Sequence, residues 1–347
     1  MLLAKIKSNM EGIYITKFGS AEASFSKQKM HLRDLEADEV LIKTSAFGIN
    51  YADIMARQGL YKEAPSLPFV PGYEVVGTIT KTGKDAEHLL NKRIVGFTRF
   101  GGYATHAISN KNAIVVLGDE VPQAEALALA TQFATAYYAT HYVQNIRRGE
   151  VVLIHASAGG VGIALNQLCK NSGAITIGLC SGEEKLNFCS SQNFDFVFDY
   201  TNDDYIDKIK SIFPKGIDVC FNSLAGKSFS KEKKLLNFCA RVVLYGGASR
   251  SGMKGGILAT LKMVWQMGIV IPIGLMMNSR SIIGINMLKI ADYKPEILSH
   301  CLQEVMKLYL SGKLKPVANH IFSSDNIADA HRLIEQRKSI GKVVCTM

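Results

Sequence analysis

Hydrophobic and polar positions follow two different patterns along the chain, and the change falls near residue 120. Before it, short apolar runs rich in β-branched and aromatic residues are separated by turn residues such as glycine and proline. Strands at this spacing predict a compact, β-rich domain. The predicted strands are 12–16, 40–49, 75–80, 93–97 and 113–116. One helix is predicted directly after Asn50, which can cap its first turn.

From residue 150 onward, apolar runs alternate with amphipathic helical patterns, after a helical stretch at 122–142. This alternation predicts parallel strands that are covered by helices on both faces. The predicted strands are 151–155, 174–180, 194–198, 217–221 and 241–245, followed by a strand at 281–287, a helix at 295–311 and a final strand at 342–345. The fold class predicted is therefore α/β, with a doubly wound parallel sheet and a separate β-rich domain.

Length and composition agree with a soluble protein of two domains. The chain has 347 residues, more than the roughly 250–300 at which a single core stops growing. Its net charge of +10 is dispersed, without a basic stripe interleaved with aromatic residues, and so predicts no nucleic-acid partner. The seven cysteines form no CxxC pair, which indicates reduced thiols in a cytoplasmic protein. The first ten residues lack the pattern of a signal peptide.

One apolar stretch, residues 263–279, stands out because it carries no charge. It is shorter than the ~20 residues that a membrane-spanning helix needs, and it contains Pro272, Gln266 and Asn278. We expect a buried or interfacial segment there rather than a transmembrane helix.

The strongest motif is the glycine-rich turn between the apolar run 151–155 and the following amphipathic helix. Gly159 lets the backbone approach a pyrophosphate, and Gly162 allows close packing of helix and strand. The first glycine of the usual GxGxxG pattern is replaced, so the motif reads AxxGxxG from Ala156 to Gly162. Free amides at the helix start favour phosphate charge. The turn predicts a dinucleotide site.

The residues after the next strand indicate which dinucleotide binds. An acidic residue about 20 positions after the turn would select NAD by binding the ribose hydroxyls. Ser181 occupies that place, and Lys185 follows. A hydroxyl and an ammonium group suit a 2′-phosphate, which a carboxylate would repel. The sequence favours NADPH, with Glu183 and Glu184 as the contrary observation.

Metal ligands are missing from the pattern of the N-terminal domain. No cysteine precedes residue 169, and the histidines before it show no ligand spacing. The sequence predicts no metal site. Oxidation of a plain alcohol would then lack a Lewis acid. Hydride addition to a quinone or a polarised alkene needs only orientation and a proton or hydrogen bond for the developing enolate.

These residues resemble the medium-chain dehydrogenase/reductase superfamily, in particular zeta-crystallin-like quinone reductases and homologues of the synaptic-vesicle amine transport protein. The segments that carry the resemblance are 48–61, 71–79, 156–168, 216–226 and 311–322. The resemblance implies a GroES-like catalytic domain at 1–122, a Rossmann NADPH-binding domain at 123–287 and a segment at 288–347 that returns to the catalytic domain.

The resemblance also implies site residues. Zinc-dependent relatives have a cysteine where this chain has Asn50, and a histidine where it has Tyr73. Asn50, Asp53 and Tyr61 are the implied catalytic residues, with Tyr61 as a proton donor or a rim aromatic and Asp53 as an orienting residue or helix cap. A second tyrosine of zeta-crystallins is Met55 here. The implied cofactor residues are Ala158, Gly159, Gly160, Val161, Gly162, Ser181, Lys185, Tyr200, Asn222, Tyr245, Gly246 and Gly247.

Two functions from different classes remain open. The first is an NADPH-dependent reductase of a quinone or an α,β-unsaturated carbonyl (an enone). The second is an NADPH-binding protein with little turnover that contacts lipid or membrane through residues 255–279, a segment resembling an insertion of the vesicle-protein branch. An alcohol dehydrogenase ranks third. The apolar edge 281–287 predicts a homodimer by strand pairing across a two-fold axis.

Overall fold

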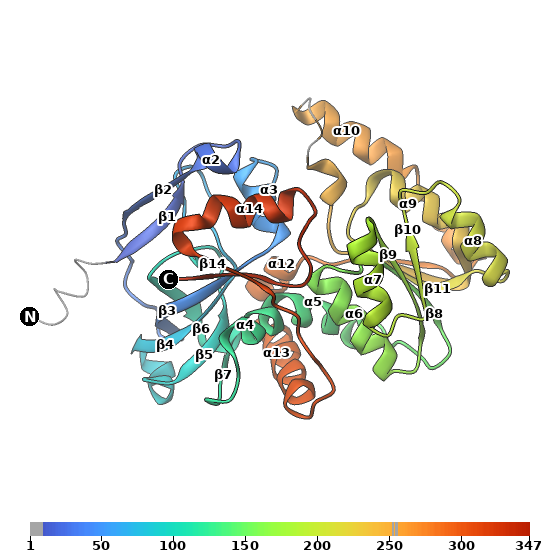
Figure 1. Ribbon diagram of the computed structural model, residues 1–347. Helices are drawn as coiled ribbons and strands as arrows, with labels where there is room; N and C mark the ends of the chain where they lie inside the picture. Colours follow the sequence, from blue (N-terminus) through green and yellow to red (C-terminus); the bar gives the residue numbers. More distant parts are fainter. Residues whose placement is uncertain (1–9, 252, 254–255) are drawn as a thin grey trace, which may run out of the picture. The chain divides into compact units, whose positions relative to one another are not determined.

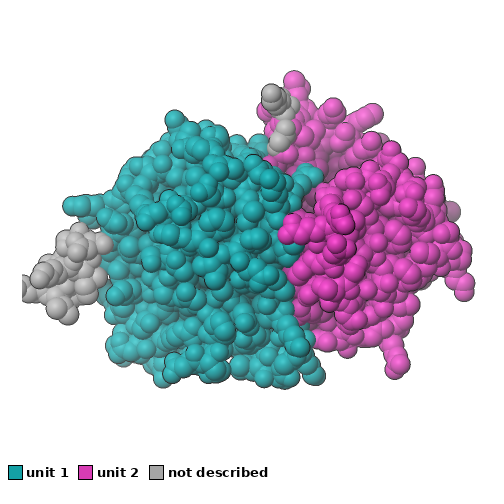
Figure 2. Space-filling model, viewed as in Figure 1, with its two compact units in different colours: residues 1–134, 287–347 teal, residues 135–286 magenta. Residues whose placement is uncertain are grey.

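The computed structural model describes residues 10–251, 253 and 256–347. The expectation about a signal peptide, and residue 255 of the predicted lipid contact, therefore concern residues outside the described part of the chain. The chain forms two compact units (Figure 2): Met1–Ala134 with Met287–Met347 make unit 1, and Thr135–Asn286 make unit 2.

Unit 1 is built on a mostly antiparallel sheet in the order β14-β15-β3-β4-β5-β7, with β6 paired to β3 (Figure 1). Its strands are β3 (Glu39–Ile49), β4 (Glu74–Thr82), β5 (Arg93–Phe97), β6 (His106–Asn110), β7 (Ile114–Val116), β14 (His320–Ser323) and β15 (Val343–Thr346). The last strand, β15, lies antiparallel to β3 with Val343 opposite Ile49. The end of the chain therefore completes the sheet that its first third begins.

The core of unit 1 lies between this sheet and the elements around it. Apolar residues of β3 and β4, such as Ile42, Phe47 and Ile79, are fully buried in it. A two-stranded sheet, β1 (Glu11–Ile15) with β2 (Phe25–Lys29), also contributes side chains. The helices of unit 1 are α2 (Ala21–Ser24), α3 (Tyr51–Arg57), α4 (Gln123–Ala128), α12 (Met287–Tyr293), α13 (Pro295–Leu310) and α14 (Ile327–Glu335).

Unit 2 contains a parallel sheet of six strands in the order β10-β9-β8-β11-β12-β13. Its strands are β8 (Val151–His155), β9 (Ile175–Cys180), β10 (Phe196–Asp199), β11 (Ile217–Asn222), β12 (Leu236–Leu244) and β13 (Ser281–Gly284). The helices between them are α6 (Gly160–Asn171), α7 (Glu183–Ser191), α8 (Tyr205–Ile212) and α9 (Gly226–Glu232). Because β8 lies between β9 and β11, the strand order reverses at β8, and ligands of such sheets bind at this switch point.

Two further helices of unit 2, α10 (Gly256–Met267) and α11 (Pro272–Met277), precede β13. They carry the apolar stretch that the sequence singles out. Of the two expected alternatives, a buried or an interfacial segment, burial within the described chain is not observed: Trp265 is 82% exposed and Ile269 is 87% exposed. The interfacial alternative stays a prediction. Among the described residues, no element covers the outer face of these two helices.

The predicted fold class is confirmed, and most predicted strands lie within one or two residues of their bounds. The strand predicted at 281–287 ends at Gly284, because its partner β12 ends at Leu244, directly opposite. Met287 instead begins α12. The helical stretch 122–142 contains two π-helical turns, Leu129–Phe133 and Tyr138–Tyr142. The sequence pattern did not indicate the strands β2, β6 and β14 or the helices α10, α11, α12 and α14.

Candidate functional site

The glycine turn joins β8 to α6 in unit 2. Gly159 is the N-terminal cap of this 12-residue helix. A side chain at Gly162 would place its Cβ 2.7 Å from the Cα of Ser157, so only glycine lets the helix pack this closely on the turn. The amides of the first helical turn have no intrahelical acceptor and point out of the N-terminus. The predicted residues Ala158, Gly159, Gly160 and Val161 lie at this helix N-terminus, and their role at a phosphate stays a prediction.

The next strand ends in the residues that the sequence assigns to the cofactor ribose. The Ser181 hydroxyl donates to the hydroxyl of Tyr200 at 3.2 Å, so the structure brings these two residues together. Lys185 lies half buried on α7, whereas Glu183 and Glu184 are exposed. Asp199, which the sequence analysis missed, accepts a bond from the Gly182 amide at 3.3 Å. Its position at the end of β10 was the available clue.

Asn222, at the end of β11, is buried and fixes the loop that follows. Its Oδ1 accepts from the amides of Leu224 and Ala225 at 2.9 and 2.8 Å. Its Nδ2 donates to Glu232 at 2.8 Å. The amide of Tyr245 donates to the carbonyl oxygen of Asn222 at 3.3 Å, which places Gly246 and Gly247 beside the same loop.

Glu232 links two neighbouring strands of the sheet, β8 and β11. Besides Asn222, its carboxylate contacts the Nε2 of His155 on β8 and the thiol of Cys220 on β11, the latter at 3.2 Å. All four residues are buried. Glu232 was not among the predicted site residues, although a histidine inside the apolar run 151–155 indicates that a polar partner must lie nearby.

Unit 1 holds a buried polar network at the end of β3. The Asn50 Nδ2 donates to Glu74 at 2.8 Å, and the Lys342 ammonium donates to the Asn50 Oδ1 at 2.9 Å. Lys342 also forms an ion pair with Glu74 and is 0% exposed. A side chain at Gly48 would lie 2.5 Å from the Lys342 side chain, so this glycine leaves the ion pair its space. The predicted site residue Asn50 is therefore held by two charged partners that the sequence analysis did not assign.

Asp53 joins the same network from the first turn of α3. Its carboxyl oxygens accept from the amides of Asn50 and Gly72 at 2.8 and 3.0 Å. Burial raises the pKa of Asp53 to about 7, although the bond from Asn50 and the charge of Lys342 act in the opposite direction. The geometry is that of a helix cap that also orients the neighbouring loop.

Tyr61 follows α3 and is half buried. Its ring meets that of Tyr73 nearly at a right angle, with 6.1 Å between the ring centroids. Tyr73 in turn packs against Phe100 at 5.1 Å. Burial raises the pKa of Tyr61 to about 12, so its hydroxyl is protonated at neutral pH. Unit 1 therefore places two tyrosines in an aromatic cluster.

Among the described residues, no three His, Cys, Asp or Glu side chains are grouped so that they could hold a metal ion. The positions that the resemblance equates with zinc ligands hold the Asn50 amide, bonded to Lys342, and the Tyr73 phenol.

Two family models match the chain: an alcohol dehydrogenase GroES-like domain at residues 36–119 and a zinc-binding dehydrogenase at residues 192–345. With the fold, these matches define the class as a dehydrogenase-type oxidoreductase with a Rossmann domain that binds a nicotinamide cofactor. The synaptic vesicle membrane protein VAT-1 homolog of Danio rerio is 30% identical over 96% of this chain and 69% of its own length. The protein belongs to the medium-chain dehydrogenase/reductase superfamily, in the group of VAT-1 homologues and quinone oxidoreductases.

Two further comparisons agree with this placement. The quinone oxidoreductase of Sus scrofa is 29% identical over 96% of this chain and 97% of its own length. The structure of Escherichia coli quinone oxidoreductase complexed with NADPH superposes with a TM-score of 0.84 at 23% identity, over 97% of this chain and 100% of that one. The family resemblance is confirmed, while the roles of individual site residues stay predictions.

Proposed function

We propose that this protein is an NADPH-dependent, zinc-independent reductase that transfers hydride to a quinone or an α,β-unsaturated carbonyl. The observation that carries the proposal is the glycine turn at the start of α6, at the switch point of a parallel sheet. The name of the porcine relative, a quinone oxidoreductase, supports the same type of acceptor.

The residues of unit 2 fit the proposed cofactor. Ala158, Gly159, Gly160 and Val161 would hold the pyrophosphate, since they lie at a helix N-terminus, although the Gly159 amide itself donates to the carbonyl oxygen of Ala156 at 2.8 Å. Ser181 and Tyr200 present adjacent hydroxyls and Lys185 a nearby positive charge, which suit a 2′-phosphate. Asn222 would keep the loop at 223–226 and the turn at 245–247 in a fixed arrangement.

NADPH, when bound, supplies the hydride. Tyr61 is the proposed proton donor, because its phenol is protonated at neutral pH and stands on a turn where its side chain is only half buried. Addition of hydride to an enone forms a carbon–hydrogen bond and moves the double-bond electrons toward the carbonyl oxygen. The proton from Tyr61 then completes the reduced product, and solvent returns a proton to the phenolate.

Zinc independence is supported by the donor set rather than by any missing ion. Asn50 offers an amide oxygen, which is bonded to the Lys342 ammonium, and a positive charge already stands at this point of the network. A zinc ion beside that ammonium would meet like charge and no thiolate or imidazole ligand.

The test begins with fluorescence titration of NADPH and NADH. NADPH consumption is then measured against a panel of quinones, enones and simple alcohol or aldehyde pairs. We expect tighter binding of NADPH than of NADH, turnover with quinones or enones, and no loss after treatment with a metal chelator. Lys185→Glu should reverse the preference for NADPH, and Lys170→Glu, on the preceding helix, serves as a charge-matched control. Turnover of an alcohol that disappears with chelator would contradict the proposal.

A second candidate function, contact with a lipid surface, is favoured by the exposed helices of unit 2. Residues Gly256–Met277 are apolar and long enough to cross a membrane by length and composition alone, and 6% of the apolar window is buried. The chain breaks helical continuity at Gly268 and Pro272. An apolar surface of this extent marks an interaction site. The break divides the stretch into helices of 12 and 6 residues, each shorter than the ~20 residues that a spanning helix needs.

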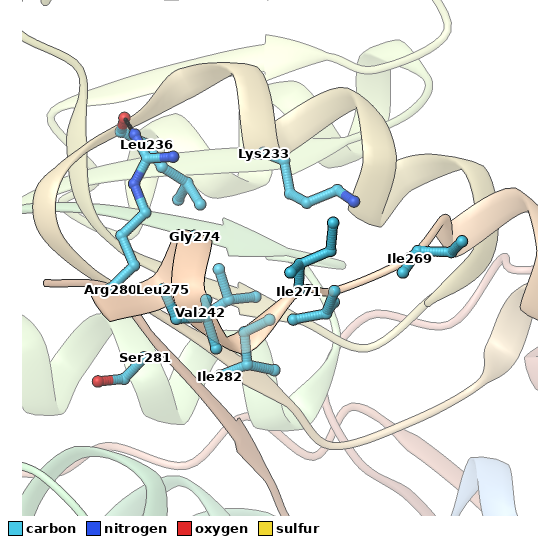
Figure 3. Close-up of a pocket in the computed structure, with 11 residues that line it drawn as sticks. Lys233, Leu236, Val242, Ile269, Ile271, Gly274, Leu275, Arg280, Ser281 and Ile282 are labelled. Atoms are coloured by element: carbon cyan, nitrogen blue, oxygen red, sulfur yellow. Dashed lines mark hydrogen bonds between the residues drawn. The ribbon is translucent and has the colours of Figure 1, made fainter. Parts of the chain in front are cut away.

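A groove of about 260 Å³ lies between α11, with the preceding residues 269–271, and the strands β12 and β13. Figure 3 shows Ile271, Val242 and Ile282 between the side chains of Lys233 and Arg280. Lys233 donates to the carbonyl oxygen of Met267 at 2.9 Å, and Arg280 to that of Asn237 at 3.0 Å. An apolar lining with two cations at its rim suits an amphiphile that carries negative charge.

Trp265 makes this second candidate directly measurable, because it is the only tryptophan of the chain. Insertion into a bilayer should shift its emission to shorter wavelength with vesicles of acidic phospholipid, and less with neutral vesicles. Ile269→Asp should abolish co-sedimentation with vesicles, whereas Ile212→Asp, an exposed isoleucine on α8, should not. Equal emission with and without vesicles would contradict lipid contact.

The homodimer expected from the sequence remains a proposal that β13 supports. This strand is the edge of the six-stranded sheet and pairs only with β12 within the described residues. Pairing of two copies through β13 would satisfy its free backbone groups. Light scattering should therefore give twice the monomer mass, and a single monomer mass would rule this dimer out.

A further inference from the structure

Tyr73 has a buried hydroxyl without a hydrogen-bond partner among the described residues. The residue stands directly before β4 and is 3% exposed. Its backbone is bonded, since its carbonyl oxygen accepts from the Thr98 amide at 2.6 Å. Buried hydroxyls in native proteins are almost always paired, so an unpaired one requires an explanation. A ligand atom that supplies the missing partner is such an explanation.

The surroundings of this hydroxyl indicate the kind of ligand. The ring of Tyr73 contacts Phe100 and Tyr61, and Phe69 packs against Phe100 at 5.9 Å. Flat aromatic walls favour a flat, apolar molecule, which can stack against them. Burial raises the pKa of Tyr73 far above that of a free phenol, so this group stays protonated and offers a hydrogen rather than a negative charge. The missing partner is thus an acceptor on a planar molecule.

We propose that Tyr73 is a second substrate-binding hydroxyl, which donates a hydrogen bond to the carbonyl oxygen of the planar acceptor beside Tyr61. This inference rests on the proposed reductase function. Tyr73, in the segment directly before β4, and Tyr61, after α3, bring two phenol rings together in this unit.

The two tyrosines differ in their surroundings, so each has a different role in the proposed reduction. Tyr73 is enclosed, keeps its proton, and stabilises the negative charge that develops on the acceptor oxygen. Tyr61 is half buried and delivers the proton. Access to the enclosed hydroxyl requires a covering side chain to move, and Tyr61, on the turn after α3, is the covering ring with the most exposure. A substrate therefore enters where Tyr61 now meets Tyr73.

The decisive variant is Tyr73→Phe, which removes one oxygen atom and keeps the aromatic packing. We expect the kcat/KM for a quinone to fall about 10²-fold, as for loss of one oxyanion donor. The dissociation constant of NADPH should stay unchanged, and Tm should rise, because a buried unpaired hydroxyl has been removed. A merely structural tyrosine would lower stability and activity together. Tyr205→Phe, a buried tyrosine in α8 of unit 2, is the matched control and should leave kcat/KM unchanged.

Binding without turnover separates this inference from the function on which it rests. Calorimetry with duroquinone, in the absence of NADPH, should give a dissociation constant that is about tenfold weaker for Tyr73→Phe than for the unaltered protein. Equal constants, or no binding to either protein, would overturn the role of Tyr73. Failure of the reductase function would show elsewhere, as a lack of NADPH consumption by the unaltered protein with every acceptor.

Discussion

The two units break the usual partition of polar and apolar residues in opposite ways. Unit 1 buries the ion pair of Lys342 and Glu74 completely, while unit 2 exposes Trp265 and Ile269 to more than four fifths of their surface. Charged residues are almost never fully buried unless they are paired, and large apolar patches are rarely left open. Each departure therefore marks a place where something other than ordinary stability shapes the sequence.

The two units differ in whether the unusual residues find partners within the chain. The buried network of unit 1 is closed: Asn50, Lys342 and the Thr131 amide share the carboxylate of Glu74. The apolar surface of unit 2 is open, because no described residue covers its outer face. A closed polar network holds its side chains in one arrangement, as a reaction site requires. An open apolar surface is stabilised only when a partner covers it.

Removing one member of the closed network should have the largest effect on stability. Lys342→Met leaves the Glu74 carboxylate buried without its counter-charge, and we expect a loss of about 3–5 kcal/mol in the free energy of unfolding. Urea denaturation measures this loss. The double variant Lys342→Met with Glu74→Gln removes both charges and should recover a large part of it. A loss below about 1 kcal/mol for the single variant would show that the pair is solvated in solution.

The pH dependence of stability probes Asp53 in the same network. Its pKa is raised from 3.8 to about 7 by burial, so between these values the folded state holds a proton that the unfolded state releases. Stability from this group is therefore present at low pH and is lost as the pH rises toward 7, by about 3 kcal/mol between pH 5 and pH 8. Well above pH 7 the contribution of Asp53 to the free energy of unfolding should no longer change with pH.

The contribution of Asp53 is isolated by comparison with Asp53→Asn. Buried histidines such as His331, whose pKa burial lowers, act in the opposite direction and lose stability as the pH falls. The difference between the two proteins cancels them. The asparagine variant should lack the decline between pH 5 and pH 8, although its amide leaves one of the two backbone donors unpaired. Parallel curves for both proteins would exclude the raised pKa.

The fold could be predicted from the sequence where a buried element consists of consecutive apolar residues. The run 151–155 coincides with β8, because a parallel strand covered on both faces is buried along its whole length and is apolar here except for His155. The strands β6 and β14 were missed, because polar residues interrupt their short apolar runs. The glycine turn was found for the same local reason: its strand, turn and helix are adjacent in the sequence.

The site could be predicted only in part, because the polar partners of its residues lie far away in the sequence. Asn50 and Asp53 were identified by motif, but Lys342 lies 292 residues after Asn50 and reaches it only because β15 pairs with β3. The unpaired hydroxyl of Tyr73 is likewise a property of packing and not of pattern. For residues 263–279, an apolar composition cannot tell a covered helix from an open one.

The smallest expected change in the free energy of unfolding concerns the open apolar surface of unit 2. It tests directly whether this surface is in contact with water. Ile269→Ala should change the free energy of unfolding by less than about 0.5 kcal/mol, because its side chain is already in water. Ile209→Ala, at a fully buried position of α8 in the same unit, should cost about 2–5 kcal/mol. Should Ile269→Ala instead cost more than about 1 kcal/mol at high protein concentration and little at low concentration, a second copy of the chain covers this surface. The open surface would then be a subunit interface, and this result would contradict the proposed contact with lipid.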